Sequence, residues 1–252
     1  MKRLATFIFS GLMLAITGFT APAVALDAAE KEELGAFIRE YLIANPEIFE
    51  DVQMALQVKR EAEMAAKAAG GISSNSEAIF NEPTDVVLGN PDGDVTIVEF
   101  FDYNCGYCKR AMDDMNTILE DDPNVRFVLK EFPILGPDSL AAHTVAMSFR
   151  KLMPEKYGDF HRRLLGGDVR ATEETAMLVA TALGADEAAI TAGMEDPEIE
   201  ASIRQVYRLA DVLGINGTPS YVVGDEAVYG ARGADELKSK IANLRECKST
   251  VC

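Results

Sequence analysis

The hydrophobic pattern of the chain alternates between short apolar runs and apolar positions spaced as on one face of a helix. Runs rich in β-branched and aromatic residues predict buried strands over 95–101 and 125–132. Helical spacing predicts a helix over 109–119 between them. Shorter strand patterns are found at 86–88, 220–223 and 227–229. A hairpin turn joins the last two.

A long block with helical periodicity separates the first strands from the last two. Glycine and proline divide it into predicted helices over 139–152, 154–165, 172–183, 186–194 and 197–213. A closing helix is predicted over 233–244. The order is therefore strand, helix, strand, a helical insertion at about 138–214, a strand pair and a helix. That order predicts an α/β sandwich with helices inserted into it.

Two amphipathic helices are predicted before this mixed part of the chain. Apolar residues recur with helical spacing at Leu34, Phe37, Ile38, Tyr41 and Leu42. Asn45-Pro46 predicts the start of a second helix, which we expect to stop at Gly70-Gly71. Helices this short cannot bury their own apolar faces, so they pack on the main domain or on other subunits.

The segment 70–76, Gly-Gly-Ile-Ser-Ser-Asn-Ser, has the composition of a linker. A linker favours self-association of the helices over a cap folded back on the same domain. We therefore expect an N-terminal helical oligomerisation region with its linker over 26–75, and the main domain over 76–252.

The first 25 residues have the composition of a signal peptide. Lys2 and Arg3 precede a mostly apolar stretch, and Ala23-Val24-Ala25 is a small-x-small cleavage site. A membrane anchor is the alternative, but the apolar run is short for a span. We expect cleavage after about Ala25 and export to a bacterial periplasm, where disulfides persist.

The chain carries 41 acidic and 24 basic residues, a formal net charge of −17. A surface this acidic argues against binding to nucleic acid or anionic lipid. The charge identifies no partner, because solubility alone explains it.

Two of the four cysteines form a Cys105-Gly-Tyr-Cys108 motif at the junction of a predicted strand and a predicted helix. Cys105 would lie at the helix N-terminus, where free N–H groups and the macrodipole stabilise an anion. The thiolate is the nucleophile of disulfide exchange, so Cys105 is the candidate nucleophile. Cys108, one turn later, is placed to attack a mixed disulfide. Gly106 lets a partner backbone approach closely.

This motif has two other interpretations. It could be half of a zinc site, but a structural zinc needs four ligands, and His143 and His161 lack a ligand-like spacing. It could also be a purely structural disulfide. With strand–helix–strand order around it, the motif indicates a redox pair in a thioredoxin-like fold. Such a pair needs no metal and no cofactor beyond its own disulfide.

Two further features bear on the chemistry. Gly217-Thr218-Pro219 leads into a predicted strand, which makes Pro219 a candidate for a cis bond, with an ordinary trans turn as the alternative. Glu99 lies in an otherwise apolar strand, six residues before Cys105. A buried carboxylate titrates or is paired, so Glu99 could shuttle a proton during exchange. Alternatively, it faces solvent at the end of the strand.

Cys247 and Cys252 lie at the C-terminus, far from the motif in sequence. We interpret them as a small tail disulfide that stabilises little, because its loop is short. The alternatives are a second redox pair and a soft-metal site in which two thiolates hold Cu(I). We interpret the methionines as core residues, and His143 and His161 as ordinary helix residues.

The strand into the C-x-x-C motif, the helical insertion and the strand after the Thr-Pro pair resemble the DsbA-like thiol–disulfide oxidoreductases of bacterial periplasms. The resemblance covers about residues 79–246. It implies a thioredoxin fold in which Cys105 is the nucleophile and Cys108 resolves the mixed disulfide. It also implies that Thr218 and Pro219 form a cis-proline loop that binds substrate backbone.

The N-terminal Phe-Ile-Arg-Glu-Tyr-Leu-Ile-Ala-Asn-Pro-Glu-Ile segment resembles a narrower group, the ScsC-like proteins (suppressor of copper sensitivity protein C). Some of these trimerise through this region and act as disulfide isomerases. The Cys-Gly-Tyr-Cys motif with its Tyr107, and Thr218 before the proline, also resemble the corresponding residues of the periplasmic isomerases. The DsbA oxidase instead has Pro-His between its cysteines and Val before its cis-proline. Tyr107 offers no positive charge at neutral pH, which argues against a strong oxidant. The buried glutamate of the wider DsbA-like family matches Glu99.

The resemblance implies a disulfide isomerase or reductase that acts on unfolded or misoxidised exported proteins. A membrane electron donor of the ScsB or DsbD type would keep it reduced. An oxidase that donates disulfides, reoxidised by a DsbB-type partner, is the alternative. A homo-oligomer would shield the cysteines from the oxidising machinery and present several sites to one client. An interpretation from another class is a periplasmic copper-binding or holdase protein that uses its thiols as ligands.

Overall fold

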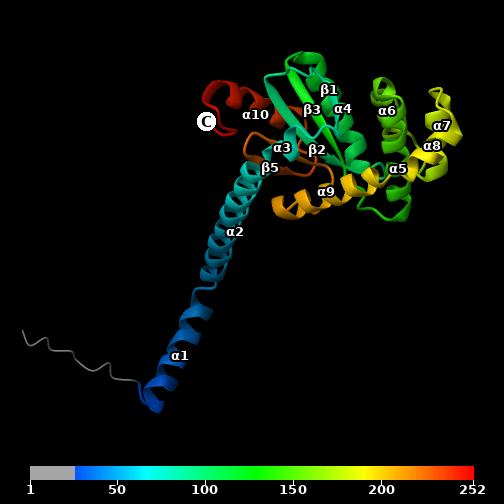
Figure 1. The fold of residues 1–252 in the computed structure, drawn as a ribbon. Coiled ribbons are helices and arrows are strands. Elements are labelled where there is room, and N and C mark those ends of the chain that lie inside the picture. The colour runs from blue at the N-terminus through cyan, green and yellow to red at the C-terminus, as the bar shows by residue number, and fades with distance from the viewer. Residues whose placement is uncertain (1–25) are drawn as a thin grey trace, which may run out of the picture. The chain divides into compact units, whose positions relative to one another are not determined.

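The structure, a computed structural model, describes residues 26–252 (Figure 1). The described residues divide into two compact units, the first ending at Leu56 and the second spanning Gln57–Cys252. The signal peptide predicted over 1–25 lies outside the described residues. Within 26–252, no helix has the length and apolar character that a membrane span requires.

The first unit contains α1 (Ala28–Ala44) and the beginning of α2 (Glu47–Ser74). A capping box starts α1, because Asp27 and Glu30 each accept the other's backbone N–H at 2.9 Å. No residue of α1 is buried. Large apolar side chains are exposed on these helices, among them Leu34, Phe37, Ile38, Tyr41, Phe49 and Val52. The predicted helical N-terminal segment is confirmed.

The second unit, described throughout, is built on a five-stranded sheet in the order β1-β3-β2-β4-β5. The strands are β1 (Val86–Gly89), β2 (Val95–Phe101), β3 (Val125–Glu131), β4 (Ser220–Val223) and β5 (Glu226–Tyr229). β2 and β3 run parallel, and the other neighbouring strands are antiparallel. β2 and β3 are buried at almost every position, which explains their continuous apolar runs in the sequence.

Helices cover both faces of this sheet (Figure 1). They are α3 (Ser76–Phe80), α4 (Gly106–Asp121), α5 (Pro137–Leu152), the 3-10 helix η1 (Pro154–Lys156), α6 (Tyr157–Gly166), α7 (Glu173–Ala182), α8 (Glu187–Met194), α9 (Pro197–Leu213) and α10 (Ala234–Cys247). The helices from α5 to α9 lie between β3 and β4. The predicted α/β fold with a helical insertion is confirmed.

Successive side chains of the central strands point to opposite faces of the sheet, which divides the hydrophobic core into two clusters. Ile97 and Phe127 point to the face covered by α4, α5, α6 and α10, whereas Val98 and Val128 point to the face covered by α9 and the end of α2. The strand that leads to Cys105 and the helix that begins there share the first of these clusters. The same hydrophobic cluster therefore holds in place the strand and the helix that flank Cys105.

Gly70 and Gly71 do not end the second helix as predicted, because α2 continues through both to Ser74. Gly71 lies against α9, and a Cβ there would come within 2.8 Å of Val212 Cγ1. The next residue, Ile72, is only 4 % exposed. Glycine here permits close packing of two helices, and that contact outweighs its low helix propensity. The segment predicted to be a linker is helical up to Ser74.

Candidate active site

Cys105 and Cys108 lie where β2 leads into α4. Cys105 is the N-cap of α4, with an extended backbone (φ −86°, ψ 109°), and its sulfur accepts from the Cys108 N–H at 3.2 Å. As a thiol, Cys105 also donates to the Thr218 carbonyl oxygen at 3.2 Å. Both cysteines are buried and unbonded. The sulfur of Cys105 thus uses an N–H group that the first helical turn leaves without a backbone partner.

The two thiols differ in acidity. Hydrogen bonding from the Cys108 thiol, with smaller help from Thr218 and from the Cys108 N–H, lowers the pKa of Cys105 to about 6, although burial opposes this. Burial raises the pKa of Cys108 far above its usual range, and its hydrogen bond to Cys105 and the nearby Glu99 raise it further. At neutral pH, Cys105 is a thiolate and Cys108 a thiol, which is the division of roles that exchange requires.

The Thr218–Pro219 peptide bond is cis, as the Gly-Thr-Pro sequence predicted. It lies in the loop between α9 and β4, and the pairing of β4 with β2 places this loop beside Cys105. Gly230 N–H donates to the Pro219 carbonyl oxygen at 2.9 Å, and the Ser220 hydroxyl donates to the Gly217 carbonyl oxygen at 2.8 Å. These bonds fix the loop next to the nucleophile candidate.

Glu99 lies on β2 and is 2 % exposed, which contradicts the solvent-facing alternative. Its residue partner across the sheet is Tyr221 on β4. Burial raises the pKa of Glu99 to about 8, with smaller contributions from the charges of Cys105 and Asp114. Glu99 in turn raises the pKa of Cys108. A mostly protonated carboxyl group therefore lies within electrostatic reach of both cysteines.

Gly106 and Tyr107, between the two cysteines, are exposed. A Cβ on Gly106 would meet no atom within 4 Å, so the space beside it is open. Tyr107 is 60 % exposed, and the Arg110 guanidinium carbon lies 4.4 Å from its ring centroid. This side of the motif is accessible to another polypeptide.

The comparison with known protein families agrees with this geometry. A family model described as a DSBA-like thioredoxin domain matches residues 96–242. The chain belongs to this DsbA-like family. A second model, the N-terminal domain of copper resistance protein ScsC, matches residues 30–63. Together the two matches make the chain a ScsC-like member of the DsbA-like thiol–disulfide oxidoreductases.

Individual relatives support the same assignment. A thioredoxin-like oxidoreductase from Silicibacter pomeroyi DSS-3 is 43 % identical, with a TM-score of 0.65, over 68 % of this chain and 98 % of its own. A linker-deletion mutant of Proteus mirabilis ScsC is 27 % identical, with a TM-score of 0.65, over 89 % of this chain and 99 % of its own. Disulfide bond formation protein D of Bacillus subtilis (strain 168) is 27 % identical over 66 % of this chain and 81 % of its own length.

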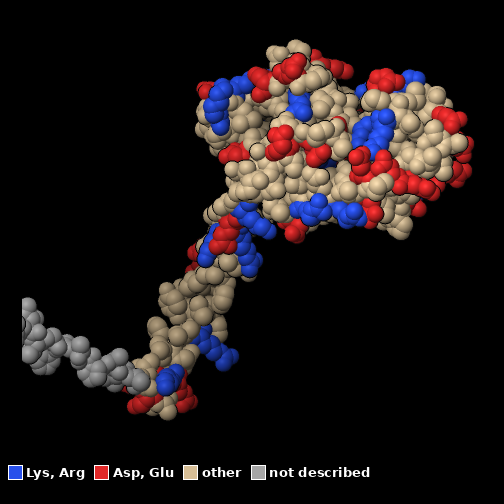
Figure 2. Space-filling model, viewed as in Figure 1, with Lys and Arg blue, Asp and Glu red and all other residues tan. Residues whose placement is uncertain are grey.

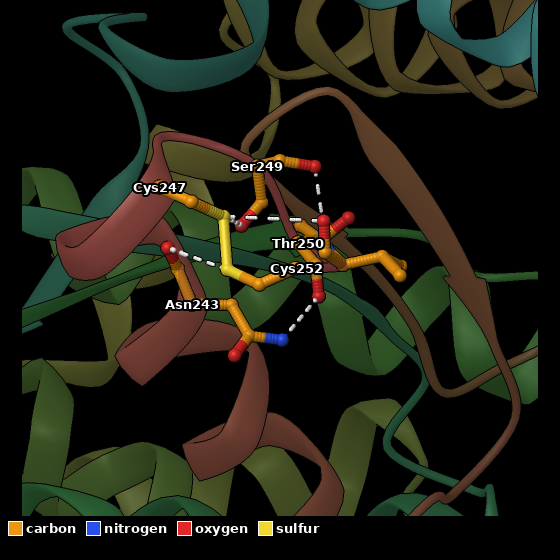
Figure 3. Close-up of a disulfide and its surroundings, with 6 residues drawn as sticks. Asn243, Cys247, Ser249, Thr250 and Cys252 are labelled. Carbon is orange, nitrogen blue, oxygen red and sulfur yellow. Dashed lines mark hydrogen bonds between the residues drawn. A yellow bond between two sulfur atoms is a disulfide. The ribbon is translucent and has the colours of Figure 1, made fainter.

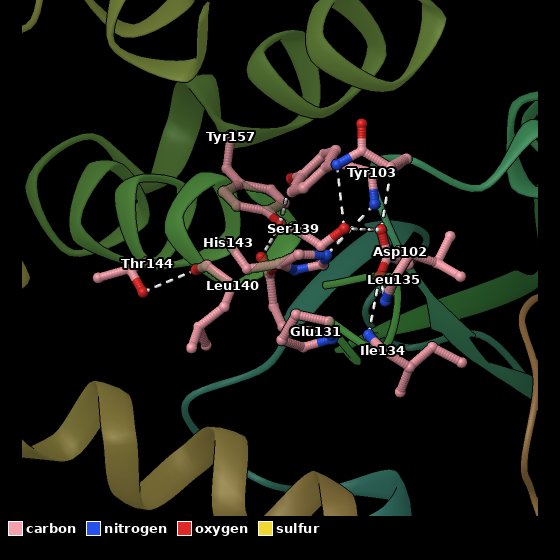
Figure 4. Close-up of polar contacts among 12 residues, drawn as sticks. Asp102, Tyr103, Glu131, Ile134, Leu135, Ser139, Leu140, His143, Thr144 and Tyr157 are labelled. Atoms are coloured by element: carbon pink, nitrogen blue, oxygen red, sulfur yellow. Dashed lines mark hydrogen bonds and ion pairs between the residues drawn. The ribbon is translucent and has the colours of Figure 1, made fainter. Parts of the chain in front are cut away.

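The DsbA-like domain also contains a buried polar cluster that the sequence analysis missed (Figure 4). Glu131, at the end of β3, accepts from the Tyr157 hydroxyl and pairs with one ring nitrogen of His143 on α5. The other ring nitrogen of His143 accepts from the Tyr103 N–H at 3.2 Å. His143 is therefore not the ordinary helix residue that was predicted, because it connects the insertion to the turn before Cys105.

His161 on α6 differs from that prediction as well. It is buried, and its Nδ1 has no hydrogen-bond partner among residues 26–252. Burial, assisted by the nearby His143, lowers the pKa of His161 to about 3, so its ring is neutral. The available signal for a buried polar cluster was the carboxylates of Asp102 and Glu131 at the ends of apolar strands. Such groups need partners when they are buried.

Cys247 and Cys252 form a disulfide with an S–S distance of 2.10 Å (Figure 3). Cys247 is the last residue of α10, and both cysteines are exposed. Asn243 Nδ2 donates to the Thr250 carbonyl oxygen at 2.9 Å, which holds the short loop against the helix. Within residues 26–252, no three side chains of Cys, His, Asp or Glu are grouped so as to hold a metal ion.

Proposed function

We propose that this ScsC-like protein is a disulfide isomerase or reductase that acts on the cysteines of exported proteins through Cys105 and Cys108. The observation that carries the proposal is the position of the Cys105 sulfur at the start of α4, where the pKa of the thiol is about 6. A thiolate nucleophile with a protonated, buried thiol one turn later is suited to exchange with a protein disulfide.

The first step forms a mixed disulfide. The Cys105 thiolate attacks one sulfur of a client disulfide, and the other client sulfur leaves as a thiolate. In isomerisation, a client thiolate then attacks the client sulfur of the mixed disulfide, and Cys105 leaves as a thiolate again. In reduction, Cys108 attacks Cys105, the client leaves reduced, and the two electrons come from the Cys105–Cys108 dithiol.

Glu99 is our candidate for the base that takes the Cys108 proton in the reductive step. The negative charge of Cys105 is one cause of the raised pKa of Glu99. Formation of the mixed disulfide removes that charge, so the pKa of Glu99 falls at the moment when Cys108 must lose its proton.

Two residues support the isomerase or reductase direction. Tyr107, between the cysteines, brings no positive charge to the thiolate, and Thr218 precedes the cis-proline as in the isomerases that the chain resembles. We propose a periplasmic location and a membrane electron donor of the ScsB or DsbD type. A DsbA-type oxidase with a DsbB-type partner is the alternative direction.

The decisive experiment is refolding of a scrambled-disulfide substrate by the reduced mature protein, beside oxidation of a reduced peptide by its oxidised form. We expect fast unscrambling and weak oxidation. Fast oxidation without unscrambling would replace the isomerase proposal with the oxidase alternative.

We also propose a homo-oligomer assembled through α1 and the first part of α2. Figure 2 shows a stretch of uncharged side chains on the helical segment. Large apolar side chains such as Phe37 and Phe49 are exposed on these helices. Deleting residues 26–56 removes this surface but keeps the buried Ala68 and Ile72 of α2. We expect a monomer by light scattering, and an unchanged mass would overturn the proposal.

A second candidate function, Cu(I) binding by the two active-site thiolates, is favoured by one observation. The matched N-terminal model describes a copper resistance protein, and soft thiolates bind Cu(I). Titration with Cu(I) of the wild type and of a Cys105→Ser/Cys108→Ser variant tests it. If the Cys105→Ser/Cys108→Ser variant protects cells as fully as the wild type does, the redox proposal is wrong.

A further inference from the structure

The three residues before the nucleophile form a turn between β2 and α4, which we call the active-site turn (residues 102–104). The Cys105 N–H donates to the Asp102 carbonyl oxygen at 3.0 Å, which closes the turn onto the nucleophile. Each residue of the turn has its own bond to the helical insertion or to the loop that leads into it, and the Tyr103 bond to His143 is one of these. The position of Cys105 therefore depends on contacts outside the C-x-x-C motif.

Asn104 directs its whole side-chain amide at the insertion. Its Oδ1 accepts from the Ala171 N–H at 2.9 Å, and its Nδ2 donates to the Ala171 carbonyl oxygen at 2.9 Å. The amide thus pairs with one backbone residue much as a neighbouring strand would. Nδ2 also donates to Ser139 Oγ at 3.0 Å. Because Ala171 lies between α6 and α7 and Ser139 lies on α5, one side chain joins the turn to two segments of the insertion.

Asp102 reinforces the same junction from the start of the turn (Figure 4). Its buried carboxylate accepts from the N–H groups of Ile134 and Leu135 at 2.8 and 2.9 Å. It also accepts from the Ser139 hydroxyl at 2.8 Å and from the Asn104 N–H at 2.8 Å. Ser139 is therefore shared, since its hydroxyl donates to Asp102 and accepts from Asn104.

Two of the polar neighbours of the Cys105 sulfur belong to different elements. The Cys108 N–H on α4 and the Thr218 carbonyl on the cis-proline loop each lie 3.2 Å away. A sulfur held between two elements keeps both contacts only while the backbone that carries it stays in place. A displacement of that backbone would lengthen and weaken at least one of these two bonds.

We propose that Asn104 is a positioning residue. By joining the active-site turn to the helical insertion, it holds the Cys105 sulfur between α4 and the cis-proline loop and so sets the reactivity of the nucleophile. The inference rests on the proposed function only for the role of Cys105. The insertion then has a chemical task in addition to packing, which is to fix the turn that presents the thiolate.

The other end of β2 offers a matched control. Asn90 also lies in a turn, but its Oδ1 accepts from the Asp92 N–H at 2.9 Å, within its own turn. The experiment compares Asn104→Ala with Asn90→Ala in the full mature protein. The measurement is the rate of Cys105 alkylation by iodoacetamide as a function of pH in the reduced protein, with no client or redox partner present.

In Asn104→Ala we expect the midpoint of the alkylation profile to rise by about one pH unit, because the displaced thiolate loses part of the hydrogen bond that the Cys108 N–H donates to it. At a pH near the wild-type midpoint, the rate then falls about fivefold. Asn90→Ala leaves the profile unchanged. Ser139→Ala removes one partner of Asn104 and one of Asp102 but keeps the Ala171 pairing, so it shifts the midpoint in the same direction by less.

A lower unfolding temperature of Asn104→Ala with an unchanged alkylation profile would overturn the proposal, because a merely structural residue behaves in that way. If Asn104→Ala does not fold, an unchanged profile in folded Ser139→Ala overturns it instead. The failure of the proposed function would look different. In that case wild-type protein would not unscramble disulfides, while the Asn104 dependence of its alkylation profile would stay.

Discussion

The two cysteine pairs of this protein lie at opposite ends of their helices. Cys105 caps the N-terminus of α4, and the Cys108 N–H points at its sulfur from 3.2 Å. Cys247 ends α10, and the sulfurs of its pair lie 3.6 to 3.9 Å from carbonyl oxygens of residues 243, 249 and 251. A helix N-terminus offers donors and a positive dipole end to a thiolate, whereas a C-terminus offers acceptors and a negative end.

The reactivity of a cysteine thiol thus depends on the end of the helix at which the cysteine lies. One pair is buried and unbonded at a helix start, and the other is exposed and bonded after a helix end. Sequence spacing alone separates C-x2-C from C-x4-C but does not say which pair is acidic. This difference supports our proposal of exchange chemistry for Cys105 and Cys108, with local stabilisation for Cys247 and Cys252.

The largest expected effect comes from exchanging serine for cysteine in each pair. Cys105→Ser removes the attacking thiolate, so unscrambling of a misoxidised substrate should be lost. The Cys247→Ser/Cys252→Ser variant should keep its rate within about twofold, because no donor stabilises a thiolate there. The measurement is the activity that the misoxidised substrate regains as its disulfides are unscrambled. Full activity in the first variant, or its loss in the second, would contradict the different roles of the two cysteine pairs.

The next effect concerns Glu99, which only the first pair has as a neighbour. Glu99→Gln keeps the size of the side chain but removes the acceptor for the Cys108 proton. Resolution of a trapped mixed disulfide should slow by about tenfold or more, while formation of that disulfide stays near the wild-type rate. Single-turnover kinetics with a disulfide-containing peptide separate the two steps. Equal rates of resolution would remove Glu99 from the mechanism.

Glu99 also predicts a pH-dependent stability difference. Its pKa is raised from the usual 4.5 to about 8, so the folded protein holds a proton that the unfolded chain has released. The free energy of unfolding of the wild type therefore decreases as the pH rises from 4.5 to about 8. Glu99→Gln lacks this decrease, because it has no proton to release there. The stability of Glu99→Gln relative to wild type should increase between these pH values in urea unfolding. Exposed Glu120→Gln is the control and should show no such trend.

The smallest effect is expected from the tail disulfide. A short loop constrains the unfolded chain only weakly, so the Cys247→Ser/Cys252→Ser variant should lose about 2 kcal/mol or less. Urea unfolding measures the loss, and the alkylation profile of Cys105 should not change. A shifted Cys105 profile would mean that the two pairs are coupled, which the comparison denies.

Features that depend on nearby residues could be predicted from the sequence. β2 was predicted over 95–101 and spans Val95–Phe101, because a strand buried on both faces leaves a continuous apolar run. The helix end predicted at Gly70-Gly71 was wrong because it depends on residues that are distant in the sequence. Whether glycine ends a helix depended on the approach of α9, a contact that no local pattern carries.

The candidate site divides in the same way. The C-x-x-C motif and the Thr-Pro pair are local and stood out in the sequence. The partners of Tyr103 did not, since His143 and Tyr157 lie 40 and 54 positions away and meet it only when the insertion packs on the sheet. The burial of Glu99 likewise follows from strands and helices on both sides of β2.

The most direct test of the central claim is the pH dependence of alkylation at Cys105 and at Cys247 in the same fully reduced protein, read by mass spectrometry. The account predicts a half-maximal rate at Cys105 near the pKa of about 6 that its hydrogen bonds produce. It predicts that Cys247, at the C-terminal end of α10, reaches its half-maximal rate at a higher pH than Cys105 does. Two superimposed profiles would contradict the account, because the helix start would then confer no special reactivity on Cys105.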